Sequence, residues 1–146
     1  MSIPLPPTPE VQRARLLEVA EAIENAPPLR CEDGYQTTEG YDQSKWNHSC
    51  GTPACIAGWT AVVACPSMWF DLGLGYLRGS DETMFVGEIA TTYFGLSAKQ
   101  ADALFDIDAC YWPEEVPVKD RFEPTQAEAA AVLRYLADNL DWEPVF

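Results

Sequence analysis

One uncharged stretch constrains the fold of this chain more than any other segment. Residues 54–65 read Ala-Cys-Ile-Ala-Gly-Trp-Thr-Ala-Val-Val-Ala-Cys and contain no Asp, Glu, Lys, Arg or His. A helix that is apolar on every side is normally buried, so we expect the other elements to pack around it. Thr52 can cap its start, and Pro53 suits the first helical position because its φ angle is already set. The stretch therefore predicts a central buried helix over about 53–65.

Helix start and stop signals predict four further helices. Their expected ranges are 9–25, 81–94, 97–105 and 125–140. The caps that support them are Thr8, the pairs Ser97 with Gln100 and Thr125 with Glu128, and Gly95 as a C-terminal stop. No segment shows sustained alternation of apolar and polar residues, so we predict an all-α fold of about five helices.

The remaining segments divide the chain into a lead-in, a single domain and its loops. Residues 1–8 are rich in proline and predict a flexible lead-in, while 9–146 is the size of one compact domain. Residues 29–49 and 109–122 lack helical periodicity and predict two long ordered loops. Residues 66–79, which contain Gly73 and Gly75, predict a loop anchored by its aromatic residues.

The net charge narrows the possible partners. The chain carries a formal charge of −14, and residues 81–146 contain 14 acidic and 4 basic side chains. Such a field repels phosphates, which disfavours direct binding to nucleic acid or anionic membranes and favours a basic protein surface. Proteins that themselves hold nucleic acid belong to this partner class. An acidic surface without a special partner is the alternative. The candidate partner-binding residues are Asp81, Glu82, Glu88 (which follows Gly87), Asp102, Asp106, Asp108, Glu114 and Glu115.

Three observations predict a cytoplasmic protein without a membrane span. The first residues lack a basic segment followed by an apolar one, so no secretory signal is indicated. Five cysteines is an odd number, which argues against a fully paired disulfide framework and fits a compartment in which thiols stay reduced. The uncharged segment 50–70 is long enough to cross a bilayer, but Pro53 and Pro66 enclose only about three turns of helix.

A cluster near the start of the central helix is the best candidate for chemistry. His48, Cys50 and Cys55 could form a thiol or metal site, and a position in the first helical turn would lower the pKa of Cys55. A structural zinc site needs four ligands, and no second doublet of Cys or His completes one. The competing interpretation is that Cys55 is a small apolar core residue. No cofactor is expected.

The same region resembles a known family. Residues 50–59 read Cys-Gly-Thr-Pro-Ala-Cys-Ile-Ala-Gly-Trp and resemble the Cys-Gly-Thr-x-x-Cys-Ile-Ala-Gly-Trp signature of an uncharacterised family of small bacterial and phage proteins. These proteins also carry an upstream tryptophan like Trp46 and a downstream segment like 95–105. The resemblance covers about residues 40–112 and implies no activity, catalytic residue or cofactor.

Together these features favour a non-enzymatic acidic protein that binds a basic protein surface. A phage-type inhibitor that occupies a nucleic-acid groove is one form of this hypothesis. The alternative is a thiol- or metal-dependent protein that uses His48, Cys50 and Cys55.

Overall fold

The protein is a mixed α/β structure. The computed structural model describes residues 7–30, 36–37, 39–47, 53–70 and 75–145. In these ranges the chain forms the helices α1 (Pro9–Glu24), α2 (Ile56–Ala64), α3 (Val86–Phe94), α4 (Ala98–Leu104) and α5 (Gln126–Asp138) and the strands β1 (Trp69–Phe70), β2 (Tyr76–Arg78) and β3 (Thr83–Phe85). The prediction of an all-α fold is wrong, because the segment between α2 and α3 pairs into a sheet.

The sheet is small and antiparallel, with the strand order β1-β2-β3. Leu77 of β2 pairs with Phe70 and Met84, and its side chain is fully buried. Strands of two or three residues are too short to show an alternating pattern, which is why the sequence predicted a loop over 66–79. The third helix therefore begins at Val86, after β3, and not at residue 80 or 81.

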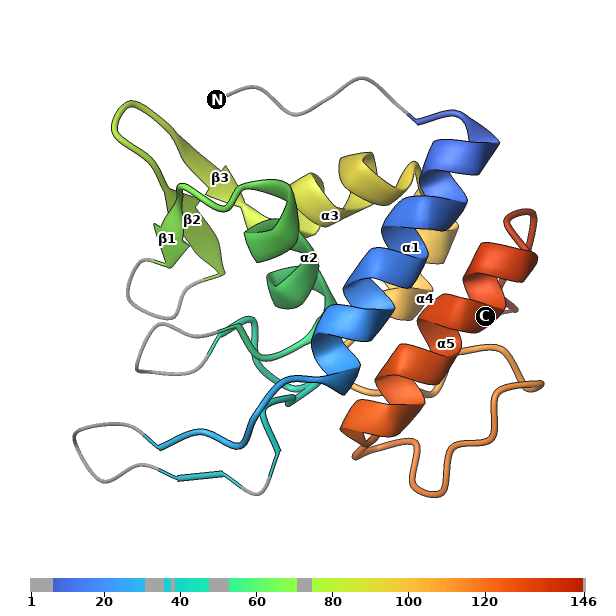
Figure 1. Cartoon of the computed structure of the whole chain (residues 1–146). Helices are drawn as coiled ribbons and strands as arrows, with labels where there is room; N and C mark the ends of the chain where they lie inside the picture. Colours follow the sequence, from blue (N-terminus) through green and yellow to red (C-terminus); the bar gives the residue numbers. More distant parts are fainter. Residues whose placement is uncertain (1–6, 31–35, 38, 48–52, 71–74, 146) are drawn as a thin grey trace.

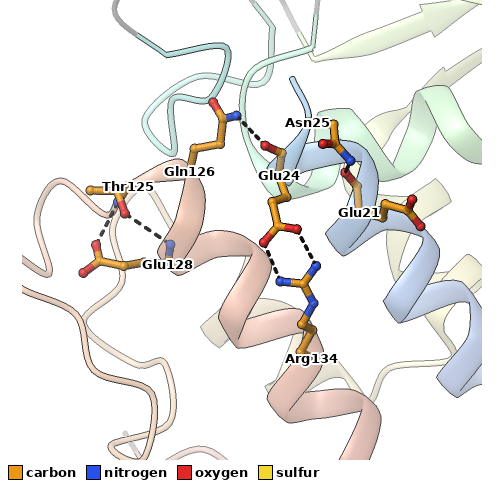
Figure 2. Close-up of polar contacts among 7 residues, drawn as sticks. All are labelled: Glu21, Glu24, Asn25, Thr125, Gln126, Glu128 and Arg134. Carbon is orange, nitrogen blue, oxygen red and sulfur yellow. Dashed lines mark hydrogen bonds and ion pairs between the residues drawn. The ribbon is translucent and has the colours of Figure 1, made fainter. Parts of the chain in front are cut away.

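Helices α1 and α5 lie side by side and antiparallel (Figure 1). Arg13 near the start of α1 pairs with Asp138 at the end of α5 at 3.2 Å. At the C-terminal end of α1, the Glu24 carboxylate accepts two hydrogen bonds from Arg134 of α5, at 2.7 and 2.9 Å (Figure 2). Gln126 donates from Nε2 to the Glu24 carbonyl at 3.2 Å, so a side chain of α5 satisfies a free carbonyl at the end of α1.

The predicted caps are confirmed where the structure describes them. Thr8 accepts a hydrogen bond from the Val11 amide at 3.4 Å. Both capping boxes are formed, and Gly95 ends α3 in the left-handed conformation with φ 66°. Helix α2 begins later than predicted, because Cys55 occupies the N-cap and Pro53 forms an isolated bridge with Asn47. Thr52 lies outside the described residues.

The buried side chains form two clusters, and α2 contributes to both of them. The first cluster joins α1 and α5 and includes Ile56 of α2. The second lies between α2, α3 and the sheet and includes Ala57, Ala61 and Leu77. The first half of α2 is buried as the uncharged sequence predicted, although Trp59 is partly exposed.

The structure tests the expected absence of a membrane span but not the expected lead-in and domain boundaries. Residues 1–6 lie outside the described part of the chain, so the flexible lead-in and the single domain over 9–146 stay predictions. Among the helices that the structure describes, none is both long and apolar enough to cross a bilayer.

Candidate functional site

A groove of about 890 Å³ lies between α3 and α4. Its walls and floor combine aromatic, small and acidic side chains. The lining residues are Trp46, Phe85, Gly87, Glu88, Thr91, Thr92, Ala101, Asp102, Phe105 and Asp106. None of these ten residues is basic, so the groove is both apolar and negatively charged.

Each helix supplies one wall of the groove. On α3, Glu88, Thr91 and Thr92 are spaced three and four residues apart, which places them on one helical face. On the other side, Asp102 lies in α4 and Asp106 follows two residues after its end. Glu88 and Asp102 are exposed and Asp106 is half-buried. The groove therefore has carboxylates on both sides.

Three aromatic rings give the groove its apolar surface. Trp46 and Phe85 pack edge to face, with ring centroids 4.9 Å apart. Tyr76 of β2 also contacts Phe85, at 5.5 Å between ring centroids. Phe105 is partly buried and packs against both core clusters. Trp46 and Phe105 pack against the buried core and also line the open groove, which is typical of residues that anchor a binding partner.

Glycines make room for two of these rings. A Cβ atom on Gly87 would lie 2.7 Å from the ring of Phe85, and one on Gly75 would lie 2.7 Å from the indole of Trp46. Gly75 also has φ 79°, a conformation that other residues rarely adopt. A Cβ atom on Gly58 of α2 would lie 2.1 Å from the Trp46 carbonyl oxygen. Gly58 therefore lets the backbone of Trp46 approach the buried helix α2.

A buried glutamine fixes the end of α4 beside the groove. Gln43 donates from Nε2 to the carbonyls of Leu104 and Asp106, at 3.1 and 2.5 Å. Its Oε1 accepts a hydrogen bond from the hydroxyl of Tyr41, which is also buried. Trp112 donates to the same Leu104 carbonyl at 3.3 Å. Two loops that are distant in sequence thus hold the backbone that carries Asp106.

The structure brings together only some of the acidic residues predicted to bind a partner. Glu88, Asp102 and Asp106 share the groove. Asp81 and Glu82 line a separate cavity of about 320 Å³ beside the hairpin. The other three lie outside the groove: Asp108, which accepts a hydrogen bond from the Cys110 amide, and the exposed pair Glu114 and Glu115.

The sequence did not identify the aromatic residues as part of a site. Trp46 falls within the expected loop 29–49, and Phe85 and Phe105 look like ordinary apolar positions of the expected helices 81–94 and 97–105. Gly58, Gly75 and Gly87 make room for Trp46 and Phe85, but the sequence does not show which residue each glycine contacts. Thr91 and Thr92 carried no signal of their own.

The thiol of Cys55 has the surroundings of a core residue. Its side chain is 3% exposed, and burial raises its pKa to about 11 despite the opposing effect of the nearby helix amides. Such a thiol is protonated at neutral pH. His48 and Cys50 lie outside the described residues. Within the described ranges, no three His, Cys, Asp or Glu side chains lie close enough to hold a metal ion.

The described chain is thus a mixed α/β protein with an open groove that joins aromatic rings to carboxylates. No protein-family model, curated protein or solved structure matches it. The resemblance of residues 50–59 to the bacterial and phage family stays a prediction.

Proposed function

We propose that this chain is a non-enzymatic binding protein and that the groove between α3 and α4 takes a basic segment of a partner protein. The observation that carries the proposal is the composition of the groove. Three carboxylates surround three aromatic rings, and no basic side chain is among the lining residues. A ligand that complements this surface has apolar groups for the rings and positive charge for Glu88, Asp102 and Asp106.

The charge of the whole chain supports the same kind of partner. A formal charge of −14 creates a field that attracts basic proteins over several ångströms and repels nucleic acids. Proteins that hold nucleic acid carry basic surfaces, and they belong to the proposed partner class. Occupation of such a surface would block the nucleic acid, as an inhibitor of phage type does. The proposal includes a cytoplasmic location, where thiols stay reduced.

Binding of a defined basic peptide tests the proposal. The probe is a fluorescent twelve-residue peptide with equal numbers of arginine and lysine separated by leucine and alanine. Fluorescence anisotropy would be measured at low and at physiological ionic strength. We expect binding that weakens as salt rises, because exposed charges are screened over a Debye length of about 8 Å at 0.15 M.

Two triple variants of equal net charge distinguish binding at the groove from binding to the acidic surface in general. The groove variant combines Glu88→Gln, Asp102→Asn and Asp106→Asn, and the control combines Glu114→Gln, Glu123→Gln and Glu143→Gln. Each removes three charges, and all three control residues are exposed outside the groove. We expect the groove variant to lose about tenfold in affinity, since exposed ion pairs contribute roughly 0.2–1 kcal/mol each. Equal losses in both variants would remove the groove from the proposal, and no binding by the native chain would refute it.

A further inference from the structure

We propose that the groove between α3 and α4 selects arginine over lysine in the partner segment, with one guanidinium group held against the aromatic rings and between the carboxylates of the two walls. This inference rests on the proposed function and names the chemical group that the groove recognises. Phe105 and Trp46 would supply the stacking surfaces, and Glu88 and Asp102 would accept the hydrogen bonds.

The arrangement of the groove offers the two contacts that a guanidinium group makes best. Its planar face stacks on aromatic rings, and its edge donates parallel hydrogen bonds to a carboxylate. Trp46, Phe85 and Phe105 supply rings, while the acidic residues stand on both walls. A lysine ammonium is a compact and strongly hydrated charge, so it gains less from a ring and loses more water on entry.

The chain already uses this contact elsewhere. The guanidinium of Arg15 lies 4.4 Å from the ring centroid of Tyr93. The same side chain donates from Nη1 to the Tyr93 carbonyl at 2.8 Å, while the Tyr93 hydroxyl donates to Glu18 at 2.7 Å. An arginine in this protein thus combines a ring with a polar acceptor, and a carboxylate lies at the far edge of that ring.

The size of the groove indicates that the arginine arrives as part of a longer segment. About 890 Å³ is much more than one side chain occupies, and it lies in the range of pockets for larger ligands. Gly87 and Ala101 contribute little side-chain volume, which leaves space beside the rings. The complementary occupant is an arginine with small or aliphatic neighbours.

A pair of peptides with the same charge tests the selectivity. Both are acetylated nonapeptides with three basic residues among alanine and leucine, and the basic residues are all arginine in one and all lysine in the other. We expect the arginine peptide to bind the full-length chain about three- to tenfold more tightly, measured by calorimetry at physiological salt.

Two groove variants show whether the preference arises at the rings. Phe105→Leu removes one ring, and Phe122→Leu is the matched control because Phe122 is 73% exposed and lies outside the groove. Thr92→Arg places a guanidinium in the groove at a half-buried lining residue, so it keeps the test valid if Phe105→Leu fails to fold. We expect both groove variants to lose the preference and Phe122→Leu to retain it.

The outcomes distinguish this inference from the proposed function. If both peptides bind equally and the acidic groove variant weakens both, the selection of arginine is refuted and the proposed function stands. If neither peptide binds, both proposals are refuted. A preference for arginine that persists in Thr92→Arg would show that it arises outside the groove, which also refutes the inference.

Discussion

Replacement of Gly58 by alanine should destabilise the protein, although alanine is the better helix former. In a helix interior the change normally gains about 1 kcal/mol. Here the new Cβ atom would lie 2.1 Å from the Trp46 carbonyl oxygen, so the loop and α2 must separate by about 1 Å to restore an ordinary contact. Overpacking of this kind costs about 1–3 kcal/mol.

The separation would also strain a backbone hydrogen bond. The Ala54 amide donates to the same Trp46 carbonyl at 3.3 Å, and the loss of such a bond costs about 0.5–1.5 kcal/mol. With the gain in helix propensity subtracted, we expect Gly58→Ala to lower the free energy of unfolding by about 2 kcal/mol. Because Trp46 lines the groove, the variant should also bind the basic peptide less tightly.

Equilibrium unfolding in urea measures this change, with Gly79→Ala as the control. A Cβ atom on Gly79 would meet only the flexible Met68 side chain, at 3.4 and 3.7 Å. We expect the control to change stability by less than about 0.5 kcal/mol. If Gly58→Ala is as stable as the native protein or more stable, the close approach of Trp46 to α2 is refuted.

Three further predictions concern the buried thiol and one helix cap. Cys55 should resist iodoacetamide at pH 7.5 in the folded protein and react in urea, whereas the exposed Cys110 should react before unfolding; mass mapping of labelled peptides checks both. Since burial raises the pKa of Cys55 from 9.0 to about 11, the folded state holds this proton more tightly than the unfolded state. The contribution of the protonated Cys55 thiol to the free energy of unfolding is therefore complete below about pH 9 and falls by about 2–3 kcal/mol as the pH rises to 11. In urea unfolding between pH 8 and 11, the stability of Cys55→Ala should depend less on pH than that of the native protein. Thr125→Ala removes the acceptor for the Glu128 amide, at 3.2 Å, and should lower the melting temperature through a loss of about 1 kcal/mol, whereas Thr125→Ser should retain it.

The helix ends at Thr8, Gly95, Ser97 and Thr125 were predictable because their causes are local. Thr8, Ser97 and Thr125 each bond an amide within three residues, so the sequence contains the whole interaction. Gly95 likewise adopts a conformation that its own residue type favours. These signals do not depend on how the helices pack.

The sheet and the groove depend on contacts between distant residues. Tyr76 becomes a strand residue because it pairs with Phe85. Both strands are too short for an alternation of apolar and polar residues to be recognised in the sequence. The start of α3 was misplaced for the same reason, since the expected helix 81–94 includes the residues of β3. The groove needs Trp46, Phe85 and Phe105 together, and these come from a loop, the end of β3 and the C-cap of α4.

The pairing of α1 with α5 also determines when the protein can fold during its synthesis. The residues of the Glu24 and Arg134 pair are 110 positions apart, so α1 is made long before its partner helix exists. At a synthesis rate of about 5–20 residues per second, α5 is made about 5–20 seconds after α1. During that interval Leu16, Val19 and Ile23, which α5 helps to bury, lack their final partner. A chain that ends before α5 keeps this face exposed, so truncated products should be open to proteases and to aggregation.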